Sequence, residues 1–425
     1  MPKPLPESRP LKTVAAQPQG PAATITRRAS DRLRAGHLWV YRSDIESLIP
    51  AIGATEIAPG TLVTITDSRG IPLGTALYSA ASQITLRLVS PEPSLSRPTY
   101  LEQLRDRVNA ALTLREQLAP DSAANNASRL IFSEADNLPG IIADRYNDLV
   151  ILQLLTQGTA QDDVRQLLTD TLRERLHPST IIERPDPKVR ELEQLAAPSP
   201  APLYSKDSDP SLTTIFTING LRLNYDASSG QKTGAFLDQR LNYAAAASYA
   251  KGRALDICTY QGGFALHMAQ RCDQVTGIDA SRAALQVADR NLELNPQLQA
   301  KVEWIEADAF EFLRDYEAAG EKFDTIVLDP PAFAKSKRAT EGALRGYKEL
   351  NLRAMKMLEP GGTLITCSCS HHVPLEEFTN VVASAASDAG RRVQILEIRG
   401  AAPDHPAILT LPETSYLKCL ICRVS

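Results

Sequence analysis

The second half of the chain repeats one pattern, in which a short apolar run ends near an acidic residue and a helical stretch follows. The four runs span 254–257, 275–278, 302–305 and 325–328, and helical patterns lie between them, as at 264–269 and 283–294. Because parallel strands need crossover connections, this alternation predicts a doubly wound parallel sheet. Ligands of such sheets bind beyond the carboxyl ends of the strands, so we expect the functional site at that edge.

The rest of the chain predicts additional domains, as expected for 425 residues, which exceed the usual size of a single core. Short β-branched runs between residues 60 and 89 predict small antiparallel strands. Helical spacing at 99–117 and 162–176, around an apolar run at 149–155, predicts an α+β domain that ends near the Pro-rich stretch 197–202. The expected organisation is a disordered tail over 1–22, a β domain over 23–96, an α+β domain over 97–200 and an α/β domain over 201–425.

The distribution of charge along the chain restricts where a polyanion would bind. The net charge is −4, but residues 1–44 hold eight basic and three acidic side chains, a local excess of five positive charges. A nucleic acid would therefore contact a local basic patch, although a solvated positive face explains the same excess. The six cysteines form no regular framework, and neither a signal peptide nor a membrane-length apolar run is present. We expect a cytoplasmic protein that makes no membrane contact.

A glycine-containing turn follows the first strand of the α/β domain. It runs from Asp256 through Cys258, Gly262 and Gly263 to Phe264 and lacks the Gly-x-Gly-x-x-Gly spacing of dinucleotide sites. An acidic residue at its start would repel a pyrophosphate but can pair with a cation, and S-adenosylmethionine carries both a sulfonium and an amino group. The segment predicts a cofactor turn, although a tight turn without a ligand has the same composition.

Acidic residues also follow the second and third strands. Asp279 lies 23 residues beyond Asp256, where a carboxylate can accept hydrogen bonds from both ribose hydroxyls, and Ser281 lies beside it. Asp308 is placed to bind an adenine amino group, with Ala309 and the Phe310 ring next to it. Each Asp taken singly is equally explained as a helix N-cap.

The fourth strand ends in Asp329-Pro330-Pro331-Ala332-Phe333. Two successive prolines fix φ and remove two donors, so this turn is rigid and its carbonyls can face a ligand. We expect Asp329 and Pro330 to border the cofactor, and Pro331 and Phe333 to hold a flat nucleobase edge. A simple turn that terminates the strand is the alternative.

Cysteine chemistry is available where the segment 366–372, Thr-Cys-Ser-Cys-Ser-His-His, follows the expected strand 362–365. A thiolate that adds to carbon 6 of a pyrimidine makes carbon 5 an enamine carbon, which can then attack a methyl sulfonium. Either Cys367 or Cys369 suits this step by position alone. His371 and His372 can serve as bases, but polar loop residues are the favoured interpretation.

The other cysteines have simpler interpretations. Small buried side chains are expected at Cys272 and Cys367, and also at Cys258 despite its place in the cofactor turn. Four thiolates of a zinc site are available at Cys367, Cys369, Cys419 and Cys422. The segment that contains Cys419 and Cys422 is expected to be a strand, and residues three apart on a strand face opposite sides, so no metal site is predicted.

With these residues assembled, the chain resembles the PUA-domain-containing class I methyltransferases that make 5-methylcytosine in bacterial 23S ribosomal RNA. The segment 32–41, RLRAGHLWVY, is similar to the opening of the PUA domain, and 132–140, FSEADNLPG, to the middle domain of the family. The most specific match is 230–240, GQKTGAFLDQR, which precedes the cofactor fold.

The resemblance implies an N-terminal β-barrel PUA domain, an α+β middle domain and a Rossmann-like α/β methyltransferase domain. It implies that the PUA domain binds RNA, for which we select Arg32, Arg34, His37 and Trp39, and that Lys232, Thr233, Gly234 and Phe236 enclose the methyl donor. It assigns cofactor roles to 256–264, Asp279 and Asp308, and selects Cys369 over Cys367 as the nucleophile. It also implies a homodimer.

The sequence hypothesis is thus a methyltransferase that uses S-adenosylmethionine to form 5-methylcytosine in 23S ribosomal RNA. Cys369 adds to carbon 6 of the flipped base, and Asp329 orients or protonates the ring near N3. One rival is a nitrogen methyltransferase, because Asp-Pro-Pro-x-Phe approaches the Asn-Pro-Pro-Tyr pattern. The other rival is a non-catalytic RNA-binding or ribosome assembly factor. The base that removes the carbon 5 proton is unassigned.

Overall fold

The computed structural model describes residues 20–228, 234–334 and 337–425. Its residues form two compact units. The first unit contains the described residues up to Leu104 together with Leu155–Gln166 and Pro187–Ala196, and the second contains the remainder. The expected α+β domain therefore contributes residues to both units, and the boundaries drawn from sequence stay predictions. Most of the expected tail, residues 1–19, lies outside the described residues.

The N-terminal part of the first unit is a six-stranded sheet, and the short runs between residues 60 and 89 form three of its strands, β4 to β6. Its strands follow the order β2-β6-β5-β4-β1-β3 and are antiparallel except for β1 and β4. Helix α1 (Arg27–Arg34) begins where the Thr26 hydroxyl accepts a hydrogen bond from the amide of Ala29. Alternate residues of the strands, such as Val63 and Ile65, are fully buried in one core. The strands span Ala22–Ile25 (β1), Trp39–Tyr41 (β2), Ile45–Ile49 (β3), Leu62–Thr66 (β4), Pro72–Tyr78 (β5) and Ile84–Ser90 (β6).

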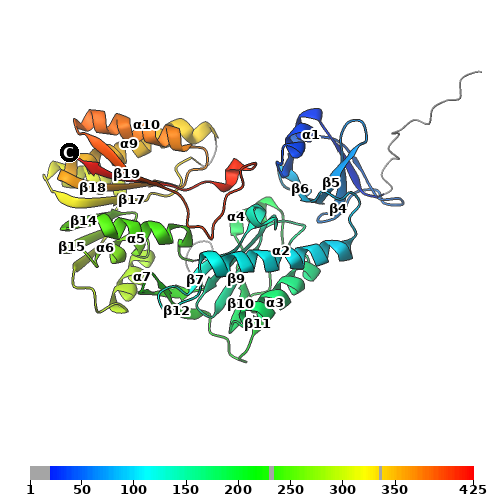
Figure 1. Cartoon of the computed structure of the whole chain (residues 1–425), viewed down its shortest axis with the longest axis horizontal. Coiled ribbons are helices and arrows are strands. Elements are labelled where there is room, and N and C mark those ends of the chain that lie inside the picture. The colour runs from blue at the N-terminus through cyan, green and yellow to red at the C-terminus, as the bar shows by residue number, and fades with distance from the viewer. Residues whose placement is uncertain (1–19, 229–233, 335–336) are drawn as a thin grey trace, which may run out of the picture. The chain divides into compact units, whose positions relative to one another are not determined.

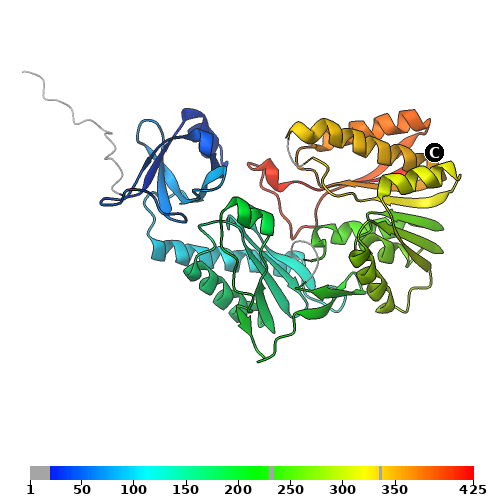
Figure 2. The ribbon, with the colours of Figure 1, turned by 180° about the vertical axis from the view of Figure 1, so that it is seen from behind.

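A second sheet confirms the α+β prediction. Helices α2 (Arg97–Leu118) and α3 (Asp162–Leu176) lie side by side on one face of this sheet (Figures 1 and 2), and Arg175 on α3 donates a 2.9 Å hydrogen bond to Asn109 on α2. The sheet order is β11-β10-β9-β8-β7, and β12 and β13 form a separate hairpin. The strands span Ala127–Phe132 (β7), Ile141–Tyr146 (β8), Leu149–Leu154 (β9), Thr180–Glu183 (β10), Tyr204–Ser205 (β11), Thr213–Ile218 (β12) and Leu221–Asp226 (β13), and α4 spans Pro187–Leu192.

The C-terminal sheet has seven strands in the order β16-β15-β14-β17-β18-β20-β19. The first five are parallel, and β20 lies antiparallel between β18 and β19. All four apolar runs that predicted parallel strands are strands here, and β19 was not predicted. The strands span Arg253–Ile257 (β14), Gln274–Asp279 (β15), Lys301–Glu306 (β16), Phe323–Leu328 (β17), Leu358–Ser368 (β18), Val393–Arg399 (β19) and Lys418–Val424 (β20).

Helices cover both faces of this sheet, as doubly wound connectivity requires. Figure 1 shows α9 and α10 on one face and α5 and α6 on the other. Alternate strand residues face the two layers, since Ile326 packs with α9 and α10 while its neighbour Val327 packs with α5 and α6. The helices span Arg240–Tyr249 (α5), Gly263–Met268 (α6), Arg282–Glu293 (α7), Ala309–Ala318 (α8), Thr340–Met357 (α9) and Leu375–Ala389 (α10). Among the described residues, no helix combines the length and the apolar character that a membrane span needs.

Candidate active site

Two neighbouring pockets open at the carboxyl edge of the seven-stranded sheet, where β14 and β17 lie side by side and the strand order reverses. We call them the Asp279 pocket and the Cys369 pocket, and their volumes are about 280 and 160 Å³. Both are lined by Phe236, Cys258, Tyr260, Asp329 and Pro330. These shared residues make the two pockets parts of one site.

The Asp279 pocket gathers the residues that sequence reasoning assigned to ribose and adenine. Asp279 accepts hydrogen bonds from the amides of Tyr260, at 2.9 Å, and Ser281, at 2.8 Å, so its carboxylate is held at the end of β15. The Asp279 pocket is also lined by the other predicted cofactor residues that follow the second and third strands, which are Ser281, Asp308, Ala309 and Phe310. Pro331 and Phe333, which were predicted to hold the target base, line this pocket too.

Two residues of this pocket also cap helices, as the alternative interpretation of Asp308 stated. One Asp308 oxygen accepts hydrogen bonds from the amides of Phe310 and Glu311, at 2.9 and 3.1 Å, at the start of α8. Ser281 caps α7 by accepting a hydrogen bond from the amide of Ala284. The same residue can cap a helix and line the pocket. In a parallel α/β sheet the helix that follows a strand begins near the edge where ligands bind, so its N-cap residue lies at that edge.

The glycine turn places backbone where larger residues do not fit. Gly262 has a φ of 86°, in the left-handed region, and a β-carbon at Gly263 would lie 2.6 Å from the Tyr243 ring. Cys258 lines both pockets and is partly exposed, so the expectation of a buried thiol there was wrong, whereas Cys272 and Cys367 are buried. A turn that bends away from the sheet exposes the side chain at its start.

Asp256 lies behind the turn and lines neither pocket. One of its oxygens accepts hydrogen bonds from the Thr259 hydroxyl at 2.6 Å and the Ala265 amide at 2.9 Å. The other oxygen, Oδ1, is buried and has no hydrogen-bond partner among the described residues. Complete burial raises the pKa of Asp256 to about 7. Direct pairing of Asp256 with a cofactor cation stays a prediction.

The segment before α5 supplies one wall of both pockets. Phe236 lines each of them, and Gly234 packs so closely against Tyr225 that a β-carbon would lie 2.2 Å from its ring. The predicted cofactor residues Lys232 and Thr233 lie outside the described residues.

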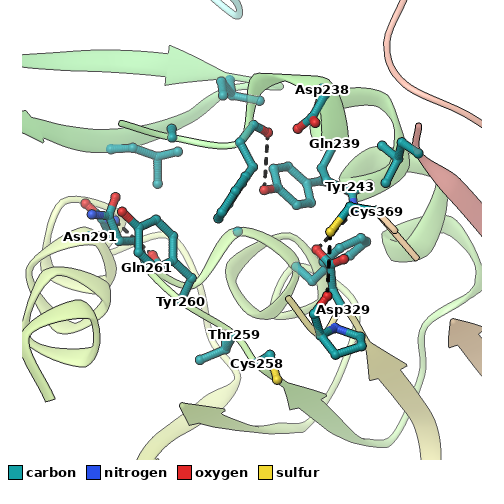
Figure 3. A pocket seen from close by; sticks show the side chains of 18 of the residues that line it. Asp238, Gln239, Tyr243, Cys258, Thr259, Tyr260, Gln261, Asn291, Asp329 and Cys369 are labelled. Atoms are coloured by element: carbon teal, nitrogen blue, oxygen red, sulfur yellow. Dashed lines mark hydrogen bonds between the residues drawn. The ribbon is translucent and has the colours of Figure 1, made fainter. Parts of the chain in front are cut away.

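The Cys369 pocket brings the predicted nucleophile close to the Asp-Pro-Pro turn. Cys369 follows β18, and its Sγ lies 3.9 Å from the Pro330 carbonyl oxygen (Figure 3). Figure 3 shows Asp238, Gln239, Tyr243 and Asp329 on the same side of the pocket as Cys369. Cys367, the alternative nucleophile, is fully buried and faces Cys419 across the strand pair. Position in the fold therefore favours Cys369, which sequence spacing alone did not distinguish from Cys367.

Asp329 has an unusual protonation state. Its enclosure in the pocket, followed by the nearby Asp238 and Asp256, raises its pKa to about 8, and only a hydrogen bond donated by the Gln239 amide, at 3.0 Å, opposes this. Asp329 is consequently mostly a neutral acid at pH 7. It can donate a hydrogen bond to a ring nitrogen, as the sequence hypothesis requires.

Sequence reasoning missed several residues of this pocket. Gln239 and Asp238 belong to the matched segment 230–240, which was the available signal, but neither was selected individually. Tyr416 donates a hydrogen bond to Asp238, and Tyr243 lies against the glycine turn. No local pattern identifies Tyr416, because it reaches the pocket from a segment that follows β19.

The cysteines that suggested zinc do not converge. Cys419 packs in the core layer with α5 and α6, and Cys422 packs in the layer with α9 and α10. Within the described part of the chain, no three His, Cys, Asp or Glu side chains are grouped to hold a metal ion. His371 and His372 are exposed in a turn, in agreement with the favoured loop interpretation.

The basic residues that were predicted to bind RNA belong to the first unit. Arg32 pairs with Asp44 at 2.5 Å and Arg34 pairs with Asp67 at 2.7 Å, so both predicted RNA contacts are engaged within the domain. His37 accepts a hydrogen bond from the amide of Trp39. A shallow surface depression on α1 is lined by Arg32 and, in addition, by Arg27 and Arg28, which sequence reasoning counted as basic but did not select.

Comparisons with known proteins agree with this geometry. Residues 23–91 match the model of a PUA-like domain, and residues 154–412 match that of an S-adenosylmethionine-dependent methyltransferase. Proteins named ribosomal RNA large subunit methyltransferase I from Yersinia pestis and Yersinia pseudotuberculosis are 37% and 36% identical, in alignments that cover 91% of this chain and 95% of theirs. The solved structure of SMU.776 in complex with SAH has the same fold, with a TM-score of 0.78 at 19% identity, and the match covers 94% of this chain and 99% of that one.

Proposed function

This chain belongs to the ribosomal RNA large subunit methyltransferase I family of S-adenosylmethionine-dependent enzymes, and we propose that it methylates carbon 5 of a cytosine in 23S ribosomal RNA. The relatives are named as methyltransferases of large-subunit ribosomal RNA, and we propose the same substrate for this chain, with carbon 5 of cytosine as the target atom. The single observation that carries the target atom is the position of Cys369, which lies with Asp329 in a pocket that adjoins the cofactor pocket.

The residues of the Asp279 pocket fit the adenosyl part of S-adenosylmethionine. Asp279 and Asp308 offer carboxylate oxygens to hydroxyl and amino groups, and Phe310 offers an aromatic face. The close glycine backbone suits the cationic methionine end, and Asp256 lies buried behind that turn. When bound, the cofactor supplies a methyl group on a positively charged sulfur.

The Cys369 pocket supports activation of the base. The Sγ thiolate of Cys369 forms a bond to carbon 6, and the electron pair of the C5–C6 double bond moves toward N3, which takes a proton from Asp329. Carbon 5 is then nucleophilic and takes the methyl group from sulfur, which is left as a neutral thioether. Loss of the carbon 5 proton to a base, departure of Sγ from carbon 6 and return of the N3 proton to Asp329 restore the aromatic ring, the thiolate and the neutral acid.

A nitrogen methyltransferase would use Asp329 and the two prolines but would need no cysteine. Incubation with labelled S-adenosylmethionine and unmodified 23S ribosomal RNA, followed by digestion and nucleoside mass spectrometry, separates the two chemistries. We expect label in 5-methylcytosine. Label in an N-methylated base would overturn the proposal, and a protein that binds no cofactor in calorimetry would instead be a binding or assembly factor.

We place RNA binding on the first unit, where the PUA-like domain carries α1. Arg27 and Arg28 are exposed on that helix and can contact phosphates. We also propose, from family resemblance, that the enzyme acts as a homodimer. The cysteine pattern and the expected lack of a signal peptide support a cytoplasmic location. Sedimentation equilibrium tests the dimer, since a monomer mass at micromolar concentration would contradict it.

A further inference from the structure

The residues on both sides of Cys369 are buried and belong to one hydrogen-bond network. Ser368 and Ser370 are fully buried, although Cys369 between them lines the pocket. The Ser368 hydroxyl donates to the Tyr347 hydroxyl at 3.0 Å, which shares a 2.8 Å hydrogen bond with the Ser370 hydroxyl. The backbone that carries Cys369 is therefore held before and after the thiol.

The same network reaches the Asp329 turn. The amide of Ala334, five residues beyond Asp329, donates to the Ser370 hydroxyl at 3.2 Å. The Tyr347 ring also lies 4.8 Å from the Phe333 ring, measured between centroids. The segment that holds Cys369 and the segment that follows Asp329 are thus attached to one tyrosine of α9.

Lys418 is the charged member of this network. It pairs with Ser368 in the register of β18 and β20, and its side chain is buried, with 7% exposure for the residue. Its ammonium donates to the carbonyl oxygens of Ser370, at 2.8 Å, and Tyr416, at 2.7 Å. A buried ammonium normally requires a carboxylate, yet no ion pair of Lys418 occurs among the described residues, and both acceptors are carbonyls.

Among the residues that the structure describes, Lys418 supplies a positive charge close to Cys369. Asp329 and Asp238 line the same pocket, and the hydroxyls of Tyr347 and Tyr416 approach from α9 and from the segment before β20. Burial lowers the pKa of Lys418 to about 8, and Cys369 acts in the opposite direction. His371, which is exposed in its turn, is a second titratable group near Lys418.

We propose that Lys418 is the positioning residue of the nucleophile: it fixes the backbone beyond Cys369 through the Ser370 carbonyl, and its positive charge favours the thiolate of Cys369. The role in catalysis rests on the proposed function, because a nitrogen methyltransferase would have no use for the thiolate. The electrostatic link itself is a property of the folded protein. It can be measured without RNA and without methyl transfer.

The test is the pH dependence of alkylation of the full-length protein by iodoacetamide, with each cysteine peptide quantified by mass spectrometry. For Lys418→Met we expect the midpoint of Cys369 alkylation to rise by about one pH unit, which slows the reaction at pH 7.5 by about five- to tenfold. Lys418→Arg should restore the wild-type midpoint, because the charge is retained. Burial raises the pKa of the Cys258 thiol, so Cys258 should stay unreactive in all variants. Alkylation of Cys369 in the unfolded proteins, which should be equal in all variants, serves as the internal control.

Two further variants separate charge from structure. Lys418→Gln keeps a hydrogen-bond donor but removes the charge, so it should raise the midpoint of Cys369 alkylation by about one pH unit. It replaces Lys418→Met in the test if the Met variant does not fold. Tyr347→Phe removes a partner of the same two serines but no charge, and should leave the midpoint unchanged. A wild-type midpoint in Lys418→Gln, or an equal shift in Tyr347→Phe, overturns the proposal. If Cys369→Ala still methylates RNA while Lys418→Gln shifts the midpoint, the proposed function fails and the link between Lys418 and Cys369 stands.

Discussion

Gln239 and Asp329 are 90 positions apart in the chain, and the Gln239 side-chain amide donates a 3.0 Å hydrogen bond to one carboxyl oxygen of Asp329. Gln239 is fixed in turn, because its own carbonyl oxygen accepts a 2.6 Å hydrogen bond from the Asn242 amide. One carboxyl oxygen of Asp329 therefore accepts a hydrogen bond from within the protein. The proton of the neutral acid is directed to the other oxygen, which is available to a ligand.

The first prediction concerns removal of Cys369, the proposed nucleophile. Cys369→Ala should bind S-adenosylmethionine with wild-type affinity and lose turnover by about 1000-fold or more, because no other thiol of the described residues combines exposure in this pocket with the position beyond β18. Methyl transfer to RNA and cofactor titration measure the two properties. Cys367→Ala is the matched control, and it should retain turnover while it loses about 1 kcal/mol of unfolding free energy. Turnover by Cys369→Ala would eliminate the adduct.

The protonation of Asp329 predicts a pH limit. Below its pKa of about 8 the acid is neutral and can donate to N3, so turnover should decline as the pH rises above about 8. Asp329→Asn should lower turnover by about 100-fold and remove this alkaline limb, because an amide donates a hydrogen bond but cannot transfer the proton. Single-turnover rates between pH 6 and 10 test both expectations. An unchanged alkaline limb in Asp329→Asn would assign the limb to another group.

Asp329 also affects folding stability. The pKa of Asp329 is about 8 in the folded protein, and its ordinary value, which applies to the unfolded chain, is 3.8. Between these two pH values the native state binds one proton that the unfolded state has lost. The contribution of Asp329 to the unfolding free energy must then fall as the pH rises from about 4 to 8. Denaturant titrations of the wild type and Asp329→Asn should converge at low pH and diverge toward pH 8, where the variant is the more stable. Parallel curves would contradict this assignment.

Asp308 caps α8, and substitution can separate this role from the cofactor binding that we propose for it. Asp308→Ala should lose about 1 kcal/mol of stability through the missing cap of α8, and also lose cofactor affinity by roughly tenfold. Asp308→Ser should recover the stability, since a hydroxyl can cap the helix, but not the affinity. Thermal unfolding and calorimetry measure the two effects. Full affinity in Asp308→Ser would leave Asp308 as a helix cap only.

The close approach at Gly263 predicts a steric effect. A β-carbon there meets the Tyr243 ring at 2.6 Å, so Gly263→Ala should displace the turn and cost about 1–3 kcal/mol in stability or cofactor binding. Gly342→Ala in α9 is the matched control, because the nearest atom is 3.9 Å away and alanine favours a helix. Calorimetric titration with S-adenosylmethionine and chemical denaturation compare the pair. Equal stability and equal cofactor affinity of the two variants would show that the turn accommodates a β-carbon at Gly263.

Phosphate contacts by α1 predict a change in salt dependence. Arg27→Ala and Arg28→Ala should each weaken RNA binding and reduce the slope of log affinity against log salt by about one. Arg314→Ala, an exposed arginine on α8, should leave the slope unchanged. Fluorescence anisotropy across salt concentrations provides the slopes. Unchanged slopes in both α1 variants would remove this helix from the RNA interface.

Local pattern was sufficient to predict the parallel strands of the C-terminal sheet and the acidic residues at their ends. A buried parallel strand needs a continuous apolar run, and its end must turn to solvent, so both features are visible in a few consecutive residues. The edge strand β19 was not predicted, and its apolar residues Ile395, Leu396 and Ile398 are exposed and not buried in a core. Family resemblance, and not spacing, selected Cys369 over Cys367.

The sequence by itself therefore determined the fold class, the positions of the parallel strands along the chain and the edge at which ligands bind, because these depend on apolar periodicity within short segments. Only the tertiary structure decided which of two cysteines faces the pocket, that Gln239 holds Asp329, and that Lys418 reaches the carbonyl beside Cys369. These relationships join residues that are 48 to 90 positions apart. Their geometry is set by the packing of whole strands and helices, and no local pattern of residues encodes it.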